Sequence, residues 1–126
     1  MKAPFQYAVL RAVPRVDRGE FINVGIILYC QQDDFLRAAV AVDDVRLLAL
    51  AAEVDLEAVR SAAEAVVAAC LEPVGHARDN DGLAHRFGML TAPRSTVLQP
   101  SPVHAGITTD PELTLDDLMK RLVIAR

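Results

Sequence analysis

Several residue patterns that mark particular protein classes are missing from this sequence of 126 residues. No run of eighteen apolar residues occurs, and the N-terminus lacks the apolar stretch of a signal peptide. We therefore expect a cytoplasmic protein without a membrane segment. The two cysteines, Cys30 and Cys70, form no C-x-x-C pair, which excludes a zinc site built from cysteine pairs and favours two buried thiols.

Aromatic residues and lysines are also scarce. The chain has no tryptophan, 5% aromatic residues and a net charge of −4, all of which weigh against nucleic-acid binding. No G-x-G-x-x-G, Walker A, H-E-x-x-H or G-x-S-x-G motif occurs, so the sequence predicts no cofactor and leaves open whether the protein is an enzyme. No metal is expected, because His76, His85 and His104 lack ligand spacing and the run Asp79–Gly82 is typical of a turn.

The first third of the chain has the pattern of a sheet. With 52% apolar and 24% charged residues, the composition predicts one folded domain over residues 1–126. Residues 5–13, 20–31 and 35–42 are apolar and rich in β-branched types, and short polar turns separate them. They predict an antiparallel meander of three strands.

A helical pattern follows the third strand. We expect one helix from Asp43 or Asp44 to about Glu53 and a second from Asp55 to Glu72, each with an aspartate as N-cap. Apolar residues recur every three or four positions along the second helix, which indicates that it lies across the sheet.

The last third of the chain mixes short elements. Residues 75–82 favour a turn, 83–90 a short helix, and 95–99 and 103–107 two short strands. A final helix is expected either with Asp110 as its N-cap and Pro111 at its first position, or with a later start at Thr114. The whole order predicts an α+β fold, an antiparallel sheet of three to five strands with helices packed on one face.

Two residues of the second strand are unusual in an apolar strand. Asn23 and Gly25 interrupt it, and one interpretation is a β-bulge whose free backbone groups Asn23 satisfies. The other places Glu20 and Asn23 at the mouth of a site, with Glu20 as an acid or base and Arg11 as part of an anion clamp.

The stretch from Arg86 to Gly106 combines arginines, hydroxyls and a histidine with three prolines. Arg86, Arg94 and Ser95 suit recognition of a phosphate or a carboxylate, and His104 suits a proton carrier. The alternative is an ordinary loop whose arginines pair with the acidic helices.

We predict that the segments 20–25 and 94–106 are neighbours in space. Asn23 needs a partner from elsewhere in the chain if it is buried, and a nearby arginine would stabilise the Glu20 carboxylate. Gly25 is predicted to lie where another group crowds the strand.

These segments also carry a family resemblance. The runs Arg11–Pro14 and Arg18–Ile26, with the later runs Arg86–Thr96 and Val103–Gly106, resemble a bacterial family, the domain of unknown function three-zero-three-seven. The resemblance covers nearly the whole chain. It implies a small bacterial protein often encoded beside HipA-like serine/threonine kinases, and it implies no catalytic residues.

Three functions follow as hypotheses, in this order. The first is an accessory or interaction partner of a HipA-like kinase. The second is a small binding domain or enzyme for a phosphate or carboxylate compound that uses Glu20, Arg94 and His104. The third, nucleic-acid binding, is disfavoured by the charge. The sequence leaves a homo-oligomer open.

Overall fold

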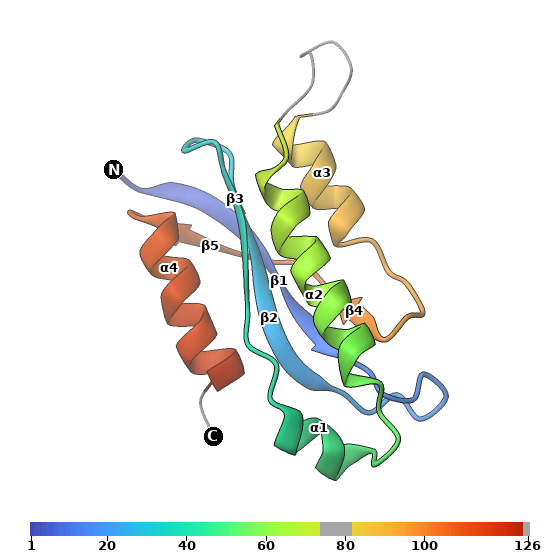
Figure 1. Ribbon diagram of the computed structural model, residues 1–126. Coiled ribbons are helices and arrows are strands. Elements are labelled where there is room, and N and C mark those ends of the chain that lie inside the picture. The colour runs from blue at the N-terminus through green and yellow to red at the C-terminus, as the bar shows by residue number, and fades with distance from the viewer. Residues whose placement is uncertain (74–81, 125–126) are drawn as a thin grey trace.

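A computed structural model describes residues 1–73 and 82–124 of the chain. Apart from Gly82, the turn expected over residues 75–82 lies outside the described residues. Five strands and four α-helices follow the expected order (Figure 1). The elements are β1 (Ala3–Ala12), β2 (Ile22–Cys30), β3 (Phe35–Val40), α1 (Asp44–Leu50), α2 (Leu56–Leu71), α3 (Leu83–Leu90), β4 (Leu98–Pro100), β5 (His104–Thr108), α4 (Pro111–Leu118) and the π-helical turn η2 (Met119–Ile124).

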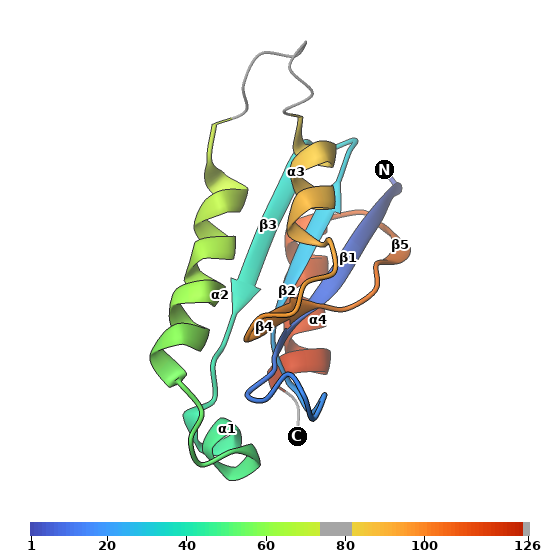
Figure 2. The ribbon, with the colours of Figure 1, turned by 90° about the vertical axis from the view of Figure 1, so that its right-hand side faces the viewer.

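The strands form one antiparallel sheet, which confirms the predicted α+β class. Its order is β3-β2-β1-β4, and β5 also pairs with β1. The predicted meander is therefore correct. The strands β4 and β5 lie one after the other along the same edge of β1, at residues 10–12 and 3–7 respectively. Figure 2 shows β5 on the side of β1 away from α2.

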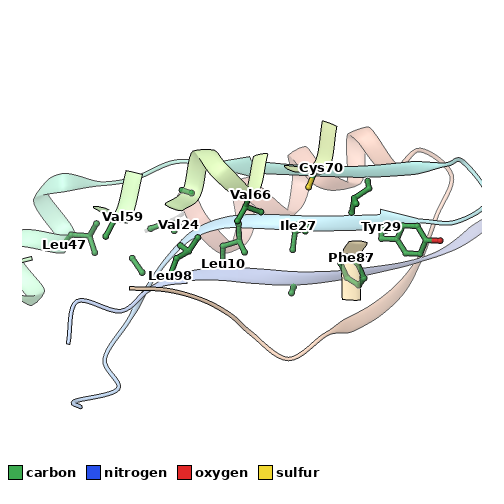
Figure 3. Packing of buried hydrophobic residues seen from close by; sticks show 14 residues of the cluster. Leu10, Val24, Ile27, Tyr29, Leu47, Val59, Val66, Cys70, Phe87 and Leu98 are labelled. Atoms are coloured by element: carbon green, nitrogen blue, oxygen red, sulfur yellow. The ribbon is translucent and has the colours of Figure 1, made fainter. Parts of the chain in front are cut away.

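Helices cover both faces of the sheet rather than the single face that we expected. On one face, α2 and α3 pack on residues such as Leu10 and Ile27 (Figure 3). On the other face, α4 and η2 pack on residues such as Val9 and Ile26, so the sheet lies between two helical layers (Figure 1). The expectation of one covered face is wrong because β1 and β2 are apolar at consecutive positions, and consecutive side chains of a strand point to opposite faces.

The helix starts agree with the capping pattern. The carboxylates of Asp43, Asp55 and Asp110 each accept a hydrogen bond from a backbone N–H in the first turn of α1, α2 and α4. Both cysteines are buried with free thiols, as expected, and they lie on opposite faces of the sheet. Burial raises the pKa of the Cys70 thiol to about 11, so this thiol stays protonated at neutral pH.

Candidate functional site

A β-bulge sets the geometry at one end of the sheet. Leu10 of β1 pairs with Gly25 of β2, but Arg11 pairs with Asn23, so Val24 has no partner on β1. A Cβ atom on Gly25 would lie 2.6 Å from the carbonyl oxygen of Ala39 in β3. The predicted close approach is therefore confirmed, and glycine is needed because β3 occupies the space that a side chain would take.

The bulge aligns three polar side chains across neighbouring strands. Arg11 pairs with Asn23 of β2 on one side and with Gln99 of β4 on the other. Leu10 and Ala12, the two neighbours of Arg11, face the α2 layer, so Arg11 faces the α4 layer. Directly paired residues point to the same face. Asn23, Arg11 and Gln99 therefore form a polar row on the α4 face, which we call the polar row.

Asn23 closes the end of the C-terminal helix. Its Nδ2 donates a hydrogen bond of 3.0 Å to the carbonyl oxygen of Leu122 in η2. The carbonyls of a final helical turn lack partners within the helix, and the amide of Asn23 satisfies one of them. Asn23 also lines an open hollow of about 630 Å³ between α1 and the end of η2, so the polar row borders this hollow at its β2 end.

Arg11 is the one member of the row whose polar group lacks a protein partner. Its guanidinium carbon lies 4.2 Å from the centre of the Phe21 ring, a cation–π contact. Its Nε is shut off from solvent, and it donates no hydrogen bond to any residue of 1–73 or 82–124. No other side-chain nitrogen or oxygen in these ranges is buried without a partner.

Phe21 and Gln99 were not among the residues singled out from the sequence. Phe21 is 44% exposed and lies outside the β2 strand, so no strand pattern indicates that it covers Arg11. Gln99 belongs to the row only because β4 pairs with β1, and a three-residue strand between prolines gives little pattern of its own. Arg11 is the one charged residue in the largely apolar strand β1, and this is the signal that singles it out.

The other sequence-predicted site residues have local partners. Glu20 lies in the loop between β1 and β2 and forms an exposed ion pair of 2.8 Å with Arg18. His104 begins β5, and its ring lies 5.2 Å from the ring of Tyr7, which packs on the α4 side of the sheet. Ser95 is exposed in the loop that leads to β4.

Arg86 and Arg94 serve the ends of helices. Arg86 donates to the carbonyl oxygens of Glu72 and Pro73 where α2 ends, at 2.6 and 3.2 Å. Arg94 donates to the carbonyl of Met89, at 2.7 Å, where α3 ends. Cationic side chains at helix C-termini satisfy free carbonyls and oppose the helix dipole. Among the described residues, these two arginines therefore pair with carbonyls and not with acidic side chains.

The two segments predicted to be neighbours flank β1 instead of touching each other. Asn23 and Gln99 lie one strand to either side of Arg11, about 10 Å apart by the strand spacing. Glu20 pairs with Arg18, and Asn23 finds its partner in η2. Arg94 lines a hollow under α2, on the face opposite to His104.

The polar row is suited to anion binding. A guanidinium with free donors, next to amide side chains and under an aromatic ring, fits a carboxylate or a phosphate group.

Within residues 1–73 and 82–124 no cluster of three metal-ligating side chains occurs, and His76 lies outside these ranges. None of the helices in the described part is both long and apolar enough to cross a bilayer.

The fold and this row define an α+β domain with an antiparallel sheet, two helical layers and one unpaired arginine at the sheet end. The chain belongs to the family described as "Protein of unknown function (DUF3037)", which it matches over residues 7–123. No curated protein matches it, and no solved structure matches it.

Proposed function

We propose that the protein is an accessory binding module that recognises a carboxylate or phosphate group of a protein partner through Arg11. The observation that carries this proposal is the guanidinium of Arg11, whose carbon lies 4.2 Å from the centre of the Phe21 ring and whose buried Nε has no hydrogen-bond partner among the described residues. The other arginines singled out from the sequence, Arg86 and Arg94, already donate to backbone carbonyls.

The free-energy cost of burying the Nε of Arg11 without a hydrogen-bond partner favours a ligand at this residue. A donor that is shut off from water without a partner costs about 1–3 kcal/mol, and more when the group is charged. A cation–π contact offsets about 0.5–2 kcal/mol of this cost. Because this Nε is shut off from solvent, an anion can accept its hydrogen bond only after the Arg11 side chain or the Phe21 ring moves, and that charge-assisted bond would then remove the remaining cost.

The surroundings of Arg11 favour a macromolecular partner over a free small anion. The exposed ring of Phe21 covers the guanidinium and offers apolar area beside the charge. Aromatic residues and arginines are enriched in protein interfaces for this combination of contacts. The partner implied by the family resemblance, a HipA-like kinase in the bacterial cytoplasm, is the one that we propose.

An enzymatic function through Glu20, Arg94 and His104 has less support. Arg94 and His104 lie on opposite faces of the sheet, and Glu20 is held by Arg18 in an exposed loop. A common reaction centre needs these groups within hydrogen-bond reach of one substrate. The alternative therefore lacks the convergence that it requires.

The test is a calorimetric titration of this protein with a HipA-like kinase. We expect binding by the wild-type chain and at least a tenfold weaker binding by Arg11→Met. Arg15→Met is the matched control, since Arg15 is exposed and paired with Asp17 at 3.0 Å. Absence of binding by the wild-type chain, or an equal loss in both variants, would overturn the proposal.

A further inference from the structure

We infer that the free edge of β5 pairs with the β5 strand of a second copy of this chain, which joins two sheets into one across a two-fold axis. The strand β5 pairs with β1 on one side and is the outermost strand there, as Figure 2 shows. An open strand edge presents unpaired backbone donors and acceptors to any strand of suitable chemistry. This inference is independent of the polar row, which lies next to β4.

The three edge segments of the sheet differ in how they are protected. The β3 strand carries Arg37 at its middle and follows Asp33 and Asp34, so charges guard that edge. The β4 strand ends at Pro100, and proline interrupts strand pairing. The β5 strand contains no proline and no aspartate, glutamate, lysine or arginine. Natural edge strands that stay unpaired are usually protected in one of these ways.

The sequence of β5 fits a second copy of itself. In an antiparallel pairing centred on Gly106, Ala105 faces Ile107 of the other copy, and His104 faces Thr108. No like charges meet, because the chain has no acidic residue, lysine or arginine from 95 to 109. Charged residues on a self-paired strand would instead bring like charges close together across the two-fold axis.

The sheet face beside this edge also lacks a cover. Ile107 is 64% exposed, and Ala105 is exposed as well. Pro4 and Gln6, their partners in β1, are also exposed, so the layer of α2 and α3 does not reach this corner. Pairing of two β5 strands would place Ala105 and Ile107 of both copies side by side on this face and bury part of this apolar surface.

The pairing closes at two copies. Each copy contributes its β5 edge to the two-fold contact, which leaves the short β4 segment interrupted by Pro100 and, as the outer edges of the joined sheet, the two β3 strands. These edges carry the charges of Arg37 and its neighbours, which oppose further strand addition. A closed dimer is therefore expected and not a fibre.

The test is the molar mass in solution, measured by light scattering on the full chain across a range of concentrations. We expect twice the 13.7 kDa mass of one chain for the wild type. Ile107→Lys and Ala105→Lys place charges at the contact and should each weaken the dimer at least tenfold. Val45→Lys is the matched control, because Val45 is 78% exposed on the distant helix α1, and it should leave the dimer intact.

Cross-linking tests the register. When Ala105→Cys and Ile107→Cys chains are mixed and oxidised, we expect the mixed disulfide to form in excess over disulfides between identical chains. A monomeric wild type, equal weakening by Val45→Lys and Ile107→Lys, or no excess of the mixed disulfide would overturn the inference.

Discussion

The side chain of Ser101 holds the two short edge strands to β1. The Oγ of Ser101 accepts a hydrogen bond of 2.8 Å from the backbone N–H of Val9. The backbone N–H of Ser101 donates to the Val9 carbonyl oxygen, also at 2.8 Å. Ser101 is 2% exposed, so water cannot replace these bonds. The hydroxyl thereby takes the place of a backbone acceptor at the bend between β4 and β5.

Replacement of Ser101 by alanine should destabilise the fold. The N–H of Val9 would lose its acceptor in a buried position, at a cost of about 1–3 kcal/mol in the free energy of unfolding. Ser95→Ala is the control, because Ser95 is exposed and should change stability by less than about 0.5 kcal/mol. Equal effects of the two substitutions in urea denaturation would show that the hydroxyl of Ser101 has no such role.

At the scale of single residues, the sequence predicts that a buried polar side chain needs a hydrogen-bond partner, but it does not predict which group that partner is. A polar side chain within an apolar strand requires a partner, and Asn23 has one. The partner is the Leu122 carbonyl, 99 positions away in η2, and the apolar periodicity that predicts a helix there does not show that the end of this helix meets β2. The sequence marks Arg86 and Arg94 by their chemistry, and the structure shows that helix ends already use their donors.

At the scale of elements, the bulge between β1 and β2 places the polar row. It allows Val24 to stay in the core under α2 while Asn23 and Arg11 face the other layer. Gly25 makes room for the Ala39 carbonyl beside the bulge. In a regular strand pair a side chain would fit at this position, so a glycine here indicates the β-bulge.

Replacement by alanine should change the free energy of unfolding in opposite directions at two glycines. Gly25→Ala brings a Cβ to 2.6 Å from the Ala39 oxygen and should lower the free energy of unfolding by about 1–3 kcal/mol. Gly88 lies in α3, where an added Cβ would have no atom within 4 Å, and Gly88→Ala should raise stability by about 0.5–1 kcal/mol. Thermal melts of the two variants check this, and a stabilised Gly25→Ala protein would refute the crowding.

Most elements were predictable because local patterns determine them. Aspartate caps fix the starts of α1, α2 and α4, and the apolar runs of β1 and β2 fix the central strand pair. The second helical layer was missed for a tertiary reason. An apolar run shows that a strand is buried, and it does not show which later helix covers each face.

At the scale of the whole molecule, the two helical layers cover different parts of the sheet. The α2 and α3 layer leaves the corner at Pro4 and Ile107 open, and the α4 layer ends at η2 beside the polar row. In the described part of the chain, the β5 edge and the sheet end at Arg11 are thereby left open for the contacts proposed above. The sequence pointed to the second through Arg11 and Asn23, but it also pointed to five residues that the fold distributes elsewhere.

The central claim is that Arg11 serves a ligand and not the fold, and the free energy of unfolding of Arg11→Met without any partner tests it most directly. Methionine keeps much of the apolar stem and removes a charged group that lacks a protein hydrogen bond. We predict a stability equal to that of the wild type within about 1 kcal/mol, or higher. A loss of about 2 kcal/mol or more would contradict the claim, because it would show that the guanidinium supports the fold itself.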